Sequence, residues 1–185
     1  MLLALASATF QPVTAATTAQ PPQVFVRDAS AQPQTGDNPH DYGVRPPADN
    51  DSDAATLYNA HNEPLHAGLG AWRNADGTAT FEPGPRTTKV HTVFHRLIPN
   101  GRYSLFVRQL APRTGAVFTP LDIIGAENNF TAGMDGSADV TVNSPLQMPA
   151  GSQLVLVFHS DGADHQSSIG VLGLNAHPQL ITRVP

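Results

Sequence analysis

The chain has 185 residues and a mass of 19.6 kDa, which is the usual size of one domain whose core needs no cross-links. It carries 10 Lys and Arg residues against 15 Asp and Glu residues and has no basic run, which excludes a nucleic-acid partner that requires clustered cations. The 15 glycines and 17 prolines are too frequent for a helical bundle, and the lack of cysteine excludes disulfides and thiolate metal sites.

The first residues resemble the end of a secretory signal peptide. An apolar stretch at residues 1–6 is followed by small residues at 13–19. We therefore interpret residues 1–19 as a leader that is either short or truncated, and expect a secreted or periplasmic protein. The alternative interpretation is a disordered Ala/Thr-rich tail. No later segment has the roughly 20 continuous apolar residues of a membrane span, so none is expected.

Residues 20–54 are predicted to form a Pro-rich extended arm or linker. Seven of the 17 prolines lie between residues 11 and 54, and this stretch lacks a sustained apolar period. Residues 23–27 are strand-like and are expected to add to the edge of a sheet. The sequence does not decide whether that sheet belongs to the same domain or to a neighbouring molecule.

From residue 55 to residue 185 the chain shows short β-type runs separated by turn residues, which indicates a single β-domain. Residues 55–60 are the first predicted strand. Residues 65–72 and 77–81 are predicted to form a hairpin, because the Asp76-Gly77 pair supplies the positive φ of a tight turn. Trp72 is expected to be a buried or half-buried anchor next to this turn.

The next predicted strand, residues 89–97, alternates between two faces. A turn at Asn100-Gly101 then leads into residues 102–110, which are predicted to return beside it. One face of the first strand carries Val90, Thr92 and Phe94, and the other carries His91, Val93 and His95.

The remaining runs complete the predicted domain. Residues 111–129 are expected to cross between sheets or to cap one end of them. Residues 129–132 and 137–142 are predicted to form a second hairpin, and residues 153–158 a central strand that is buried on both faces. Residues 179–184 are the last predicted strand. The whole pattern predicts an all-β, antiparallel, Greek-key-like β-sandwich of about seven to nine strands.

The order of these turns resembles that of uncharacterised exported bacterial β-sandwich proteins. The resemblance covers roughly residues 55–160 and rests on the segments at 70–72, 76–77, 97–106 and 130–142. It implies the fold and export but no chemistry, because the shared motifs are structural turns. The layout is also similar to that of copper-zinc superoxide dismutases, but the His-x-His pair and the cysteines of that family are missing.

The densest polar cluster in the sequence follows the central strand. It contains His159, Asp161, His165 and His177. Imidazole and carboxylate groups are ligands for zinc and copper, and residues 159 and 161 would point to the same face if the strand continued. These four residues are therefore the candidate metal ligands, although their spacing matches no specific zinc motif. The competing interpretation is a set of residues that cap turns.

The sequence lacks the common catalytic signatures. It has no Gly-x-Ser-x-Gly elbow, no His-Glu-x-x-His pair and no phosphate-binding loop, so no catalytic residue is assigned. We predict an exported non-catalytic domain that binds a partner, a surface or a small ligand through its loops and requires no cofactor. The alternative is a protein that binds zinc or copper and supports hydrolytic or redox chemistry. The partner and the oligomeric state are left open.

Overall fold

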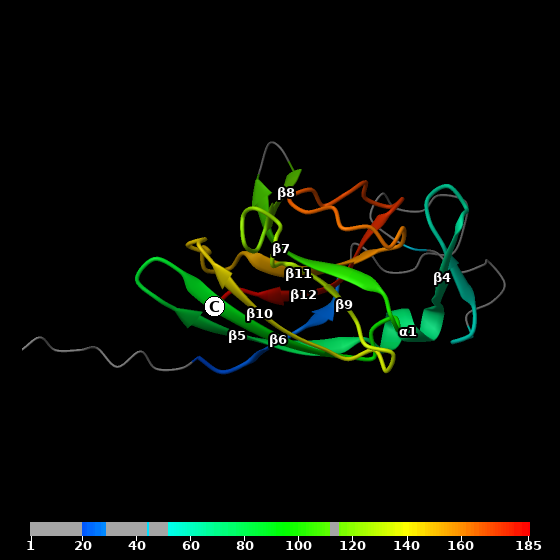
Figure 1. The fold of residues 1–185 in the computed structure, drawn as a ribbon, viewed down its shortest axis with the longest axis horizontal. Coiled ribbons are helices and arrows are strands. Elements are labelled where there is room, and N and C mark those ends of the chain that lie inside the picture. The colour runs from blue at the N-terminus through cyan, green and yellow to red at the C-terminus, as the bar shows by residue number, and fades with distance from the viewer. Residues whose placement is uncertain (1–19, 29–43, 45–51, 112–114) are drawn as a thin grey trace, which may run out of the picture.

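The computed structural model describes residues 20–28, 44, 52–111 and 115–185. In these residues the chain forms two antiparallel sheets that pack face to face (Figure 1). The protein is therefore an all-β sandwich, as the sequence predicts. The leader-like segment 1–19 and most of the arm between residues 29 and 51 lie outside the described residues.

The first sheet contains four strands, and its two central strands pair along their whole length. Its order is β1 (Gln23–Val24), β5 (Asp76–Pro83), β6 (Thr88–His95) and β10 (Ala138–Ser144). Strand β6 alternates as predicted, because Val90, Thr92 and Phe94 are buried while the intervening side chains are more exposed.

The second sheet contains six strands around the buried strand β11. Its order is β2 (Val26–Arg27), β12 (Ala176–Arg183), β11 (Gln153–His159), β7 (Arg102–Ala111) and β8 (Gly115–Pro120), and β9 (Asn129–Thr131) also pairs with β7.

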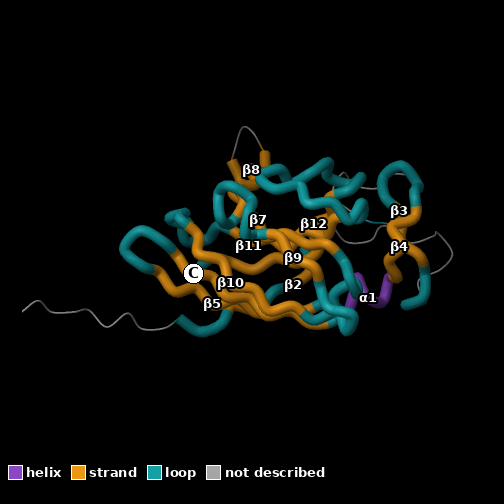
Figure 2. Tube along the Cα trace, viewed as in Figure 1, coloured by secondary structure: helices purple, strands orange, loops and turns teal. Residues whose placement is uncertain are grey.

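A smaller unit lies at one end of the sandwich (Figure 2). It consists of the hairpin β3 (Thr56–Tyr58) and β4 (Pro64–Gly68), followed by the short helix α1 (Leu69–Asn74). This helix is six residues long, and the described part of the chain contains no helix long and apolar enough to cross a membrane.

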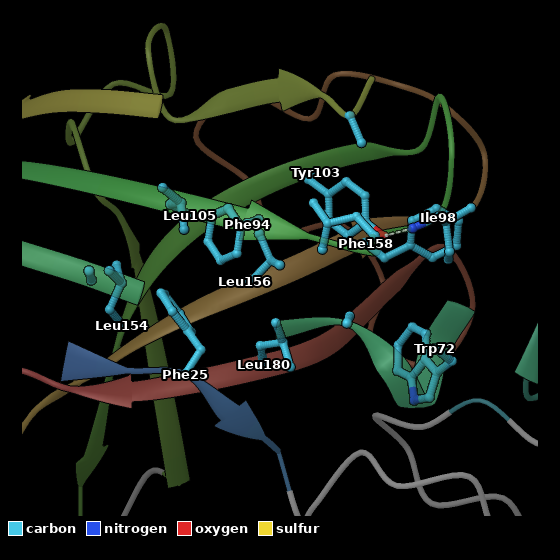
Figure 3. Close-up of a cluster of buried hydrophobic side chains, with 14 of the residues drawn as sticks. Phe25, Trp72, Phe94, Ile98, Tyr103, Leu105, Leu154, Leu156, Phe158 and Leu180 are labelled. Carbon is cyan, nitrogen blue, oxygen red and sulfur yellow. Dashed lines mark hydrogen bonds between the residues drawn. The ribbon is translucent and has the colours of Figure 1, made fainter. Parts of the chain in front are cut away.

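The hydrophobic core lies between the two sheets (Figure 3). The Tyr103 ring stacks on Phe130 with a centroid distance of 5.7 Å, and its hydroxyl accepts a hydrogen bond from the Ile98 amide. Trp72 is buried, which confirms the prediction that it is an anchor, and it meets Phe158 edge to face at 6.5 Å. Burial of such aromatic rings supplies much of the energy that holds the sheets together.

Strand β11 is buried on both faces, as predicted. Leu154, Leu156 and Phe158 face the core between the sheets, whereas Val155 and Val157 belong to a second apolar cluster on the outer face. The loop of residues 160–175, orange in Figure 1, covers that outer face with Ile169 and Leu172. The end of β11 and this loop therefore position His159, Asp161 and His165, three of the four candidate metal ligands.

The arm joins the edges of both sheets of its own domain. Strand β1 pairs with β5 and strand β2 pairs with β12, so the chain passes from one sheet to the other at Phe25. The Phe25 side chain is buried and its ring lies 4.9 Å from that of Phe94. This confirms the prediction of a strand at residues 23–27 and shows that it closes one side of the sandwich.

The predicted hairpin around Asp76-Gly77 is wrong. Strand β4 ends at Gly68 and pairs with β3, and helix α1 follows it. Leu69 and Trp72 are three residues apart and both buried, which is the spacing of one face of a helix. Gly77 is required for packing rather than for a turn, because a Cβ atom there would lie 2.5 Å from the Phe94 ring.

Two further predicted pairings are wrong. Residues 89–97 do not pair with residues 102–110, and residues 129–132 do not pair with residues 137–142, because the chain crosses between the sheets at both places. Strand β7 follows β6 but pairs with β11, β8 and β9. Strand β9 pairs with β7, whereas β10 pairs with β6.

The segment 111–129 is partly regular, because it contains β8 before the irregular stretch at 121–128. The described part of the domain from residue 55 onward has ten strands, of which eight belong to the sandwich.

Candidate functional site

His159 is the last residue of β11 and is almost completely buried. It follows the alternation of Val155 and Val157 and so lies on the outer face of the six-stranded sheet. Its Nε2 atom lies 2.6 Å from the hydroxyl of Ser104 on β7. Its Nδ1 atom has no hydrogen-bond partner among the described residues, which is unusual for a buried polar atom.

His165 and Asp161 lie next to His159. The two imidazole rings are 4.9 Å apart, and His165 Nε2 is 3.0 Å from Asp161 Oδ2. Asp161 also accepts hydrogen bonds from the Ala163 amide and from the side chain of Asn175. The loop thus brings together three of the four predicted ligands, because they are close in sequence.

The electrostatic environment keeps His159 neutral. Burial, which penalises the imidazolium form, lowers the pKa of His159 to about 4. His165, His177 and Arg102 lower it further, and the negative charge of Asp161 partly compensates. At neutral pH His159 therefore has one protonated nitrogen and one with a lone pair.

Asp161 is held in the ionised form. Partial burial acts to raise the pKa of Asp161, but the Ala163 amide, His165 and Asn175 together outweigh it, so its pKa lies below its ordinary value. A carboxylate with fixed hydrogen-bond donors is a stable acceptor next to the two histidines.

His177 lies on the other face of the sheet. It pairs in register with Phe158, and the two rings are 6.1 Å apart. Its Nε2 atom is 3.0 Å from the Ser160 hydroxyl. His177 therefore does not join the other three predicted ligands.

A β-bulge accounts for this separation. Strands β11 and β12 shift register between Leu156 and Val157, which leaves Gln179 as an extra residue. A regular ladder that continued from the Leu156–Leu180 pair would place His177 opposite His159. The bulge turns it to the opposite face.

These side chains do not form a complete coordination sphere. In the part of the chain that the structure describes, no group of three or more His, Cys, Asp or Glu side chains is placed to hold a metal ion. His91 of strand β6 lies in the other sheet, where its Nε2 atom is 2.8 Å from Asp139 Oδ1.

A hollow of about 370 Å³ lies beside this cluster, between the β3–β4 hairpin and the 160–175 loop. Its lining includes hydrogen-bonding side chains from both segments, and Leu65, Val171 and Leu174 supply apolar contacts. The polar lining residues are Asn59, His61, Glu63, His66, Ser160, Asp161 and Asn175.

Sequence reasoning missed the contribution of the β3–β4 hairpin to this hollow. His61 and His66 lie about 100 residues before Ser160 and match no local motif. His66 has a φ of 53°, a conformation that non-glycine residues adopt rarely and that is enriched at functional sites. This strain becomes visible only in the folded chain.

Comparison with protein-family models, with curated proteins and with solved structures gave no match. The geometry described above is therefore the basis for assigning a function.

Proposed function

We propose that the protein is an exported, non-catalytic binding domain that takes up a small polar ligand in the hollow beside Ser160 and Asn175. The sandwich is the rigid frame, and the β3–β4 hairpin and the 160–175 loop provide the contacts. The observation that carries this proposal is the hollow itself, because its volume of about 370 Å³ falls within the range of small-molecule sites.

The composition of the lining favours a polar ligand. Asn175 offers an amide group that donates and accepts hydrogen bonds, and Ser160 and Asp161 offer oxygen atoms that accept them. Leu65 and Leu174 exclude water from part of the ligand surface. A few fixed polar groups on an apolar wall are the usual arrangement for orienting a small molecule.

Two features favour binding over catalysis. Ser104, which contacts His159, is completely buried and has no access to a substrate. The Ser160 hydroxyl also lies within hydrogen-bond distance of the Leu174 carbonyl, which competes with His177 for its single proton. Export rests on the leader-like composition of residues 1–19.

A pair of matched variants tests the hollow. Val171 lines it and is exposed, so Val171→Trp should fill the space with little effect on folding. Val117, an exposed valine on β8, provides the control Val117→Trp. Saturation-transfer NMR against a set of small polar compounds should detect binding to the wild type and the control but not to Val171→Trp. Equal binding to all three proteins would contradict the proposal.

A second candidate function is transition-metal binding by His159, Asp161 and His165. The observation that favours it is the buried Nδ1 atom of His159, which has no hydrogen-bond partner among the described residues, on a ring whose centroid lies 4.9 Å from that of His165. If Nε2–H donates to the Ser104 hydroxyl, the lone pair of Nδ1 is available to zinc or copper. His165 and Asp161 are the candidates for the remaining protein ligands, and they would have to shift toward Nδ1, because the described side chains do not already form a group of three that could hold an ion.

Elemental analysis of untagged protein after incubation with zinc and copper tests this second function. One bound ion per chain, lost in His165→Ala, is the expected result. A metal content near zero would remove it and would leave the proposal for the hollow unaffected.

A further inference from the structure

At the opposite end of β11 from His159, three polar residues stand side by side on neighbouring strands. Gln153 pairs in register with Arg108 of β7 on one side and with Arg183 of β12 on the other. These are the first residue of β11 and its two cross-strand neighbours.

All three side chains belong to the outer face of the six-stranded sheet. Gln153 is two residues from Val155, and Arg108 is two residues from Phe106. Residues two apart in a strand point to the same face, and both apolar residues belong to the cluster on the outer face. Arg183 is two residues from Ile181 and points to the same face, and Ile181 packs against the same cluster. The row is therefore separate from the core and from the hollow at the other end of β11.

The row lines a second hollow, with a volume of about 540 Å³. The turn before β11 forms its other wall, where Gly151 adopts a φ of 83° that strongly favours glycine. The lining contains two arginines and no acidic residue, although the chain as a whole carries a net charge of -5. The lining residues are Arg108, Gln109, Leu110, Pro149, Ala150, Gly151, Ser152, Gln153 and Arg183.

Arg108 is held in a fixed orientation. Its Nε atom donates to the Gln153 side chain at 2.8 Å, and its Nη1 atom donates to Asp28 at 2.6 Å. The side chain of Arg108 is only 10% exposed and that of Asp28 only 2%. Because Asp28 balances the charge of Arg108, the exposed Arg183 supplies the net positive charge of the hollow.

We propose that this hollow binds a small molecule through a carboxylate or phosphate group. The planar guanidinium group of the exposed Arg183 matches the geometry of both oxyanions and can bind them with paired hydrogen bonds, whereas Arg108 already bonds to Gln153 and Asp28. The Cα atoms of Arg108 and Arg183 are separated by two strand spacings, about 10 Å. Because Gln153 lies between them, the exposed Arg183 side chain has to reach across only one strand spacing, about 5 Å, to contact an anion placed over Gln153.

The test uses citrate and inorganic phosphate as probes, with binding measured by isothermal titration calorimetry. Arg183→Gln removes the exposed cation, and Lys89→Gln makes the same charge change on the other sheet, where Lys89 pairs with Glu82. Saturable binding of at least one probe to the wild type and to Lys89→Gln, weakened about tenfold or more in Arg183→Gln, is the expected result. Stronger binding of citrate or of phosphate identifies which oxyanion the site prefers.

Two results would overturn the proposal: no saturable binding of either probe, or equal binding by the two variants, which would mean only a general charge effect. This site shares no residue with the hollow of the proposed function, so either can fail alone.

Discussion

Acidification is expected to destabilise the folded protein through His159. This residue is buried, and its pKa in the folded state is about 4 against an ordinary value of 6.5. Below pH 6.5 the unfolded chain binds a proton at this position that the folded chain does not accept. Stability is therefore unaffected by His159 above pH 6.5, falls as the pH decreases toward 4, and stops changing below that value.

The size of this effect follows from the shift. One pKa unit corresponds to about 1.4 kcal/mol, so the change from 6.5 to about 4 amounts to about 3 kcal/mol. This is a large fraction of the free energy of unfolding of a typical domain.

Urea denaturation at a series of pH values, with a chelator present to remove metal ions, measures the effect. His159→Gln removes the titrating group, and His95→Gln is the control because His95 is exposed on β6. The free energy of unfolding of the wild type and the control should fall by about 3 kcal/mol more than that of His159→Gln between pH 6.5 and pH 4. Parallel pH profiles for all three proteins would refute the reasoning.

Three further substitutions test the packing. Phe25→Ala should lower the free energy of unfolding by about 3 kcal/mol in urea denaturation, because the buried ring contacts Phe94 across the core; a loss below about 1 kcal/mol would mean that the arm does not close the sandwich. Ser104→Ala should cost about 1–3 kcal/mol by the same measurement, since it removes the partner of His159 Nε2, and an unchanged midpoint would argue against that contact. Gly77→Ala should lower the melting temperature in calorimetry, because the added Cβ atom would lie 2.5 Å from the Phe94 ring; wild-type melting would contradict this account of the glycine.

The sequence was sufficient for features that depend on local patterns. The alternation of strand β6, the apolar run of β11 and the strand-like residues 23–27 each predict an element that the structure contains. Helix α1 was missed because six residues are too few to show a helical period. Its two large buried side chains, Leu69 and Trp72, are three residues apart, and a single such pair does not establish a helical period.

Pairing between strands was not predictable, because it depends on contacts between distant residues. Strands β6 and β7 follow each other in the chain but belong to different sheets. The same limit applies to the candidate site. His159, Asp161 and His165 come together because they lie within seven residues of each other, whereas the position of His177 depends on the bulge at Gln179, which no local pattern indicates.

The most direct test of the central claim, that the hollow between the β3–β4 hairpin and the 160–175 loop binds a ligand, is a protein-observed NMR titration with a compound found in the screen. The account predicts saturable shifts of backbone amide signals centred on His61, Ser160 and Asn175, which line that hollow. Shifts centred on another part of the sandwich, or no shifts at all, would contradict it.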